Sequence, residues 1–397
     1  MMFFSFLTAI VAVSSVPVLI FFIEVVAALS HKDQPLQLAV RGAPRRLAVI
    51  IPAHNESTGI LPTISDIKPQ LKDGDRLIVI ADNCSDDTAA VAATAGAEVV
   101  TRDDMTRIGK GYALSWAIDH LSAAPPDLVL FIDADCRVQP DLIEKLTNAC
   151  CASGRPTQAS FLMKTAENSP IDHGLAEFAF LVKNWVRPLG LRNLRGPVQL
   201  VGTGMIFPWD AIRAVPLASG HLVEDLKLGL DLAAMGKAPR FCPSAKITSD
   251  FPVTAAGTDS QRQRWVQGHV GMILGSAPRL LLSAISGGNA ELLALTLDLL
   301  VPPLILLGFL TSLIFFVMSC VALLGGPVAP AIIGATNFVT FALAISIAWF
   351  NFGREVLPPQ RLRSIFPGIF KKAKLFVEML MGRTVSSWVR TEREKKA

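Results

Sequence analysis

The sequence predicts an α/β protein with a mainly parallel central sheet, about three transmembrane helices, and amphipathic helices at the membrane interface. Short apolar strands alternate with helices between residues 47 and 132, which is typical of a parallel sheet with right-handed crossovers. Polar side chains follow three of these strands. Apolar stretches near both ends of the chain are long enough to cross a bilayer. Hydrophobic residues make up 51% of the 397 residues, which is high for a soluble protein.

The composition also excludes some classes of function. The net charge is only +4, the basic residues are dispersed, and Tyr112 is the single tyrosine, so no nucleic-acid partner is expected. None of the six cysteines forms a C-x-x-C pair. A zinc site or a redox dithiol is therefore not expected, and a reducing compartment is favoured.

Apolar and basic segments outline the organisation of the chain. The first apolar stretch is interrupted only by Glu24, and we interpret it as a retained transmembrane helix. Basic residues follow both this stretch and the last apolar one, which places both flanks in the cytoplasm. No cluster of ionisable residues is expected within the spans, which disfavours a transporter. The predicted segments are a transmembrane helix (1–30), a basic linker (31–46), a catalytic domain (47–260), an interface segment (261–285), a transmembrane hairpin (290–352, spans 292–324 and 331–352) and a basic amphipathic tail (353–397).

The first half of the catalytic domain shows the clearest periodicity. Strands are predicted at 47–51, 76–81, 98–100 and 128–132, and helices from about residue 58, at 88–95 and at 110–121. The apolar run before Asp133 predicts a strand that is buried on both faces. These strands and helices together predict one layered α/β domain.

Three polar clusters follow predicted strands: His54-Asn55-Glu56, Asp82-Asn83, and the pair Asp133 and Asp135. Because the carboxyl ends of parallel strands meet at one edge of the sheet, we expect a single cleft there. Two carboxylates in that position can hold a hard divalent cation that binds a diphosphate. A second D-x-D, Asp73-Gly-Asp75, precedes its strand and is interpreted as a solvated turn.

The second half alternates less simply. A strand is predicted at 158–164, a helix at 171–186 that packs either on the core or on the membrane, and a strand at 200–205 that meets a glycine loop. Glu224 and Asp225 precede a helix at 226–235, where they are either functional or simply favourable charges at a helix N-terminus. Gln261-Arg-Gln-Arg-Trp265 opens a segment that becomes apolar.

These motifs together resemble one family. IPAHNE, ADN-x-S-DDT, DAD, GTGM, VED and QRQRW occur in this order between Ile51 and Trp265. From Leu47 to about Leu274 the chain resembles membrane-integrated family 2 glycosyltransferases with the Rossmann-like GT-A fold, which bind nucleotide sugars. It is similar to cellulose and hyaluronan synthases and to bacterial exopolysaccharide glycosyltransferases.

The resemblance implies a role for each motif. Asp225, with Glu224 beside it, corresponds to the catalytic base, and Asp133 and Asp135 correspond to the ligands of Mg²⁺ or Mn²⁺. The substrate-binding positions are Ala53, Asn55, Glu56 and Asp82 (nucleoside), Lys110 and Asp133 (donor), Thr203 and Gly204 (acceptor sugar), and Gln261, Arg264 and Trp265 (diphosphate and acceptor). Read without the family, Lys110 could equally start a solvated helix, and Trp265 could be a membrane-interface aromatic.

The implied reaction moves a hexose from a nucleotide sugar, expected to be a UDP-sugar, with inversion at the anomeric carbon. The acceptor is a lipid-linked saccharide or a growing exopolysaccharide at the cytoplasmic face of a bacterial inner membrane. Alternatives are glucosyl transfer to a membrane lipid and a non-catalytic subunit of a polysaccharide-assembly machine. Membrane lipid, a second copy of the chain and assembly subunits are the other partners considered.

Two departures from the synthases bear on this expectation. Val223 stands where they commonly have threonine, although Asp225 is kept. Three spans offer little material for a polysaccharide channel, and no C-terminal cyclic-dinucleotide domain is recognised. A lipid-bound acceptor is therefore preferred over a secreted polymer.

Overall fold

The structure is a computed structural model that describes residues 2–30, 45–165, 173–252 and 255–364. The chain forms two compact units. Of the described residues, one unit contains 45–165, 196–252 and 255–268, and the other contains 2–30, 173–195 and 269–364. The basic linker lies almost wholly outside the described residues, as does the amphipathic part of the predicted tail.

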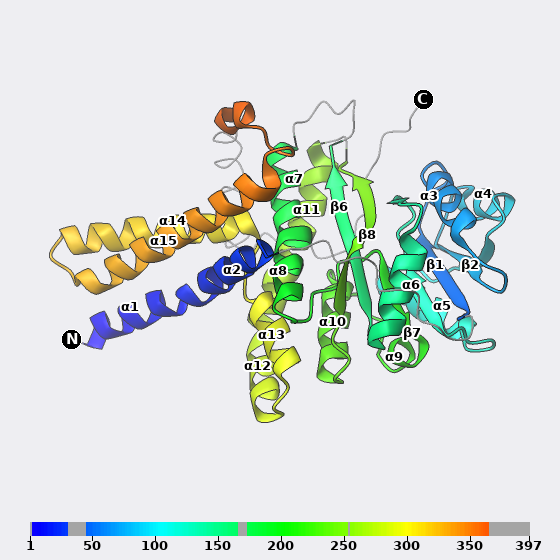
Figure 1. Cartoon of the computed structure of the whole chain (residues 1–397), viewed down its shortest axis with the longest axis horizontal. Coiled ribbons are helices and arrows are strands. Elements are labelled where there is room, and N and C mark those ends of the chain that lie inside the picture. Colours follow the sequence, from blue (N-terminus) through cyan, green and yellow to red (C-terminus); the bar gives the residue numbers. More distant parts are fainter. Residues whose placement is uncertain (1, 31–44, 166–172, 253–254, 365–397) are drawn as a thin grey trace. The chain divides into compact units, whose positions relative to one another are not determined.

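The first unit is built on an eight-stranded sheet in the order β3-β2-β1-β4-β7-β6-β8-β5. Figure 1 labels β1, β2, β6, β7 and β8 of this sheet. Its first half is parallel, as predicted from the β–α alternation. The strands are β1 (Leu47–Ala53), β2 (Arg76–Asp82), β3 (Glu98–Arg102) and β4 (Leu128–Phe131). β1 and β4 are almost wholly buried, because both faces of a parallel sheet are covered by helices.

The second half of the sheet is mixed. β7 (Met205–Pro208) runs antiparallel to both β4 and β6 (Thr157–Lys164). β8 (Arg240–Asp250) runs parallel to β6, and the short β5 (Arg137–Val138) is antiparallel to β8. The predicted strand at 200–205 is wrong, since residues 200–204 form a loop and the strand begins at Met205. Two glycines with positive φ, Gly202 and Gly204, keep that loop out of the extended conformation.

Helices cover the sheet and supply its core. The helix α5 (Lys110–Leu121), found at its predicted position, buries Ala113, Leu114 and Ala117 in the main hydrophobic cluster. Leu228 and Leu232 of another helix, α10, join the same cluster. The remaining helices of this unit include α6 and α9, which the sequence did not predict. Their bounds are α3 (Ile60–Ile67), α4 (Thr88–Thr94), α6 (Leu142–Ser153), α9 (Trp209–Arg213) and α10 (Glu224–Ala234).

The second unit is helical. Its helices are α1 (Met2–Val13), α2 (Ser15–Ala28), α7 (Gly174–Leu181), α8 (Arg187–Asn193), α12 (Ala277–Ser286), α13 (Ala290–Leu299), α14 (Leu304–Leu323) and α15 (Val328–Ala348). The π-helical turn Val182–Val186 joins α7 to α8, so the helix predicted to end at Val186 continues to Asn193. The helix α11 (Ala255–Gly275) contributes residues to both units.

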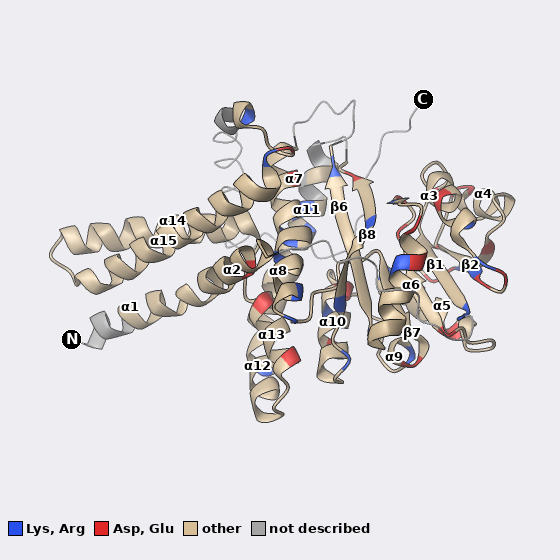
Figure 2. Cartoon of the chain, in the orientation of Figure 1, with Lys and Arg blue, Asp and Glu red and all other residues tan. Residues whose placement is uncertain are grey.

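Three helices in the described part of the chain are long and apolar enough to cross a membrane, and a bent pair, Gln261–Gly275 with Ala277–Ser286, would make a fourth if it is one span. The three are Leu7–Ala28, Leu304–Leu323 and Val328–Gly353, and α14 and α15 carry no charged residue (Figure 2). The span predicted over 292–324, with a kink or break at Pro302-Pro303, is shorter than predicted, and its candidate span covers only Leu304–Leu323. Pro302 and Pro303 separate α13 from α14, because proline cannot continue the hydrogen-bond ladder of a helix.

A buried group of ionised side chains lies within this helical unit. Arg187 of α8 donates from Nε to Glu24 Oε2 of α2 at 2.5 Å, and it also forms an ion pair with Asp298 of α13. The three residues are 7%, 1% and 5% exposed, respectively. Glu24 belongs to the first candidate span, whereas Arg187 in α8 and Asp298 in α13 lie outside the three candidate spans. Gly190 allows this contact, since a Cβ there would lie 1.9 Å from the Glu24 carbonyl oxygen.

Candidate active site

The loops that follow β1 and β2 meet at one edge of the sheet, as the parallel pairing requires. Asn55 and Asn83 both adopt left-handed backbone conformations, with φ of 56° and 51°. Asparagine tolerates this region better than most residues. The Asn55 side-chain oxygen accepts a hydrogen bond from the Ser85 amide at 2.7 Å, and the Glu56 amide donates to Thr88 Oγ1 at 2.8 Å. Asn55 thus holds the two loops together.

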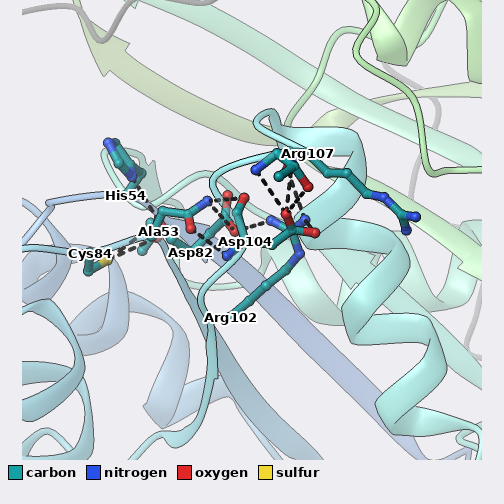
Figure 3. A network of polar contacts seen from close by, with 9 residues as sticks. Ala53, His54, Asp82, Cys84, Arg102, Asp104 and Arg107 are labelled. Carbon is teal, nitrogen blue, oxygen red and sulfur yellow. Dashed lines mark hydrogen bonds and ion pairs between the residues drawn. The ribbon is translucent and has the colours of Figure 1, made fainter.

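Asp82 lies at the centre of a polar network at this edge (Figure 3). Arg102 donates from Nη1 to Asp82 Oδ1 at 2.6 Å and from Nη2 to the Arg107 carbonyl at 2.8 Å. The His54 ring nitrogen Nδ1 lies 2.7 Å from the Asp82 carbonyl oxygen. Burial raises the pKa of Asp82, although the neighbouring Arg102 opposes that shift. Both side-chain contacts of this carboxylate, from Arg102 and Asn83, use Oδ1, and Oδ2 is not used by either.

The loop after β4 carries Asp133 and Asp135 and is held by buried hydroxyls. Thr63 of α3 is fully buried, and its Oγ1 lies 2.7 Å from the carbonyl oxygens of Ala134 and Cys136. Ser249 of β8 is 4% exposed and donates from Oγ to Asp135 Oδ2 at 3.1 Å. One contact comes from the helix α3, which follows β1, and the other from β8 in the mixed half of the sheet. They fix where the carboxylate pair points.

The glycine loop before β7 lies directly against the Asp133 loop. Thr203 is fully buried, and its Oγ1 accepts a hydrogen bond from the Asp133 amide at 3.0 Å. Gln158 of β6, 2% exposed, donates to the Thr203 carbonyl at 2.8 Å and accepts from the Val201 amide at 3.0 Å. Gly204 has no room for a side chain, since a Cβ there would lie 2.7 Å from Ile247. The loop conformation is thereby specified by its neighbours.

Lys110, the first residue of α5, bridges these two loops. Its Nζ forms an ion pair with Asp133 and donates to the Gly202 carbonyl at 2.7 Å. Burial lowers the pKa of this lysine, but the charges of Asp133 and Glu224 outweigh burial, so that the pKa lies above its ordinary value. Lys110 is therefore cationic over the whole physiological range. The alternative interpretation of a solvated helix start is wrong, since the side chain is only 20% exposed.

Glu224 and Asp225 form an acidic pair in the first turn of α10. A Cβ built on Gly202 would lie 3.2 Å from Asp225 Oδ2 and 3.6 Å from Lys110 Nζ, so both groups surround one point of the loop. Asp225 uses its other oxygen to accept from the Leu226 amide at 2.8 Å. Burial, followed by the negative charge of Asp225, raises the pKa of Glu224 to about 7. At neutral pH Glu224 is therefore partly protonated.

Gln261, Arg264 and Trp265 share one face of α11, because residues three and four positions apart lie on the same side of a helix. All three are half-buried. Arg264 experiences the negative charges of Glu224, Asp133 and Asp225. The structure thus brings Lys110, Asp133, Asp225 and Arg264 into one electrostatic field, while Asn55 and Asp82 lie with the strand-end loops of β1 and β2.

The donor set can be tested against a divalent cation. Among the described residues no group of three or more His, Cys, Asp or Glu side chains is placed to hold a metal ion. Mg²⁺ in proteins is typically bound by one or two carboxylates, with phosphate oxygens of the substrate and water completing the octahedron. Asp133 and Asp135 fit this arrangement, provided that a diphosphate supplies the remaining ligands.

Sequence patterns did not point to three of the residues that position this site: Gln158, Ser249 and Thr63. Each lies in a strand or helix whose pattern only predicts core packing. The one available signal was a polar side chain inside a run that is otherwise buried, because such a group needs a hydrogen-bond partner. Its partners lie 45, 114 and 71 residues away along the chain, respectively, so they were not identifiable from local sequence.

Comparison with known proteins identifies the class. The model of the glycosyl transferase family group 2 matches residues 128–352, more than half of the chain, and the glycosyl transferase family 2 model matches residues 48–174. The chain therefore belongs to glycosyltransferase family 2 and is an enzyme of that class. This confirms the resemblance drawn from IPAHNE to QRQRW at the level of the family.

Individual relatives match shorter stretches. Glucosyl-3-phosphoglycerate synthase of Mycobacterium tuberculosis is 41% identical over 106 residues, 25% of this chain and 32% of the relative. The low-salt glycan biosynthesis hexosyltransferase Agl6 of Haloferax volcanii is 34% identical over 106 residues, 26% of this chain and 24% of that protein. The matches span about a third or less of these relatives.

Among solved structures, mannosyltransferase PcManGT from Pyrobaculum calidifontis, in complex with GDP-Man and Mn²⁺, has a TM-score of 0.52. It shares 18% identity, and the alignment covers 87% of this chain and 98% of that one. This likeness shows the GT-A type of fold. The predicted α/β class with a mainly parallel sheet and apolar helices is thereby confirmed.

Proposed function

We propose that this protein is an inverting, metal-dependent hexosyltransferase that uses a nucleotide sugar, expected to be UDP-linked, and a lipid-linked saccharide as acceptor. The observation that carries the proposal is the convergence of Lys110, Asp133 and Asp225 around the glycine loop. A nucleoside diphosphate leaving group needs positive charge, and an acceptor hydroxyl needs a base. The site supplies both within one unit of the chain.

The donor would lie along the sheet edge. Ala53, Asn55, Glu56 and Asp82 are assigned to the nucleoside end. Asp82 fits a role in base recognition, because its Oδ2 takes no part in the contacts that Arg102 and Asn83 make to Oδ1. Asn55 acts by holding the loops of β1 and β2 in place.

The diphosphate would lie between the two carboxylates and the cationic side chains. Asp133 and Asp135 would hold Mg²⁺ or Mn²⁺, which when bound supplies Lewis-acid stabilisation of the departing diphosphate. Arg264 offers a planar fork of donors suited to phosphate oxygens, and Gln261 lies one turn before it on the same face. Lys110 adds a second cation. The positive charge is thus placed where negative charge develops.

Asp225 is assigned as the general base. A carboxylate that removes the acceptor proton lies opposite the leaving group in a direct displacement, so the reaction inverts the anomeric centre. Thr203 and Gly204 bring the loop backbone close to the acceptor sugar. Trp265 would support the acceptor through its ring. Glu224 lies beside this base, and burial together with the negative charge of Asp225 raises its pKa to about 7.

The helical unit supports the proposed acceptor and location. Three candidate spans favour a membrane-bound acceptor, either a lipid-linked saccharide or a growing exopolysaccharide, at the cytoplasmic face of a bacterial inner membrane. The same observation supports a second candidate, single glucosyl transfer to a membrane lipid. A non-catalytic assembly subunit is disfavoured, because Asp133, Asp135, Asp225 and Arg264 are all present.

The test is transfer from radiolabelled nucleotide sugars by the purified full chain and its membranes, with Mg²⁺ or Mn²⁺. Label is then separated into organic-extractable lipid and high-mass polymer. Asp225→Asn should abolish transfer while keeping donor binding. Asp119→Asn, on the exposed end of α5, is the matched control and should behave as wild type. Retained turnover by Asp225→Asn, or activity in excess EDTA, would overturn the proposed mechanism.

A further inference from the structure

We propose that Lys110 occupies the position of the divalent cation at Asp133 until a nucleoside diphosphate arrives, and so makes cation binding depend on the nucleotide. This inference rests on the proposed function. It concerns the order in which the ligands bind, not which residues hold them.

The first observation is the ion pair itself. Lys110 Nζ contacts Asp133, one of the two carboxylates assigned to the metal. The lysine side chain is 20% exposed and that of the aspartate 34%, so the contact is partly buried and still reached by solvent. A divalent cation bound to the same carboxylate would lie close to the ammonium group, and the two positive charges would repel each other. A cation that binds Asp133 must therefore displace Lys110 or bind weakly.

The second observation is that Lys110 has a second anchor. Its Nζ also donates to the Gly202 carbonyl at 2.7 Å, and Gly202 lies in the loop that Gln158 and Thr203 hold rigidly. An ammonium group has three donors and can rotate about a fixed partner. Lys110 can thus leave Asp133 for a phosphate oxygen while it keeps Gly202. The side chain needs no new backbone conformation.

The third observation concerns charge. Lys110 is also attracted by Glu224 and Asp225, so it stays in the site when it leaves Asp133. A diphosphate brings negative charge for Lys110 to pair with and oxygen ligands for the cation. Each ligand then favours binding of the other, and such coupling is reciprocal. The cation is expected to bind with the nucleotide rather than before it.

The experiment measures Mn²⁺ affinity by electron paramagnetic resonance on the full chain in detergent, alone and with saturating UDP or GDP. Lys110→Met should bind Mn²⁺ alone at least tenfold more tightly than wild type. With the nucleotide its affinity should be unchanged or weaker, so the enhancement by nucleotide falls at least tenfold. Lys110→Arg should keep the enhancement. Lys227→Met removes a cation that is paired with Asp231 on α10, and it should change neither value.

Two outcomes would overturn the proposal. Lys110→Met could leave the affinity for Mn²⁺ alone unchanged or lower, which would mean that Lys110 does not compete. It could instead strengthen Mn²⁺ binding equally with and without nucleotide, which would mean that Lys110 never leaves Asp133. Lys110→Gln removes the charge but can still donate to Gly202, and it replaces Lys110→Met if that variant does not fold. Failure of wild type to bind Mn²⁺ with either nucleotide would instead reject the proposed metal site.

Discussion

The buried ion group of the helical unit allows a quantitative test of how that unit is held together. Arg187→Met removes the one cation that, among the residues the structure describes, pairs with both Glu24 and Asp298. All three side chains are less than 10% exposed, so the two carboxylates would be left without a counter-charge and with almost no water. Breaking a buried pair in this way typically costs about 3–5 kcal/mol. The variant should therefore unfold several degrees below wild type.

The same reasoning predicts a recovery. Replacing all three groups by apolar residues of similar size, as in Glu24→Leu with Arg187→Met and Asp298→Leu, removes the burial cost together with the attraction. Such replacements are often neutral or stabilising by about 1–4 kcal/mol. The triple variant should thus melt near or above wild type, in contrast to the single one.

The assay is thermal unfolding of the full chain in detergent, followed by circular dichroism at the helical band. Arg279→Met is the matched control, since Arg279 is an exposed arginine of α12 in the same unit. Its free energy of unfolding should lie within about 0.5 kcal/mol of the wild-type value. The reasoning would be refuted if Arg187→Met melted at the wild-type temperature, or if the triple variant were as unstable as the single one.

Three further predictions concern the site. Thr203→Val keeps the shape of a fully buried side chain but removes the acceptor of the Asp133 amide. The free energy of unfolding, measured by denaturant titration, should fall by about 1–3 kcal/mol. The affinity for Mn²⁺ in the presence of UDP, measured by metal titration, should fall as well. The pKa of Glu224 is raised to about 7 from 4.5, so between these pH values the folded state holds a proton that the unfolded state has lost. The free energy of unfolding should therefore decrease as pH rises through that window. Glu224→Gln should flatten this pH dependence in denaturant titrations, and an unchanged pH dependence would contradict the raised pKa. Gly268→Ala would place a methyl group 2.5 Å from the side chain of Val223, the residue before the acidic pair, so kcat should drop. Val223→Ala in the same chain should restore kcat. A normal kcat for Gly268→Ala alone would show that α11 can shift to make room for the methyl group.

Local sequence determined much of this protein. The alternation between Leu47 and Ile132 fixed the parallel half of the sheet, because strand and helix periodicities are properties of neighbouring residues. The polar clusters after β1, β2 and β4 could be placed at one sheet edge for the same reason. The Asp73-Gly-Asp75 turn was also correctly interpreted: Gly74 has a positive φ, and Asp75 accepts hydrogen bonds from Lys72 and Leu47.

The order of the six motifs from IPAHNE to QRQRW along the chain was equally informative. Six short motifs in sequence sufficed to indicate the family that the family models then confirmed. Each motif contributes residues whose chemistry is local, in loops for most of them and on helices for VED and QRQRW. None of them needs knowledge of its neighbours in space to be recognised.

Tertiary structure decided the rest. The antiparallel entry of β7 between β4 and β6, and the pairing of β5 with β8, depend on contacts between residues far apart in sequence, which no local pattern encodes. For the same reason the sequence did not show that Glu24 meets Arg187 and Asp298, at separations of 163 residues from Glu24 to Arg187 and 111 from Arg187 to Asp298. An isolated acid in an apolar run is costly, and only the folded chain shows which cation offsets that cost.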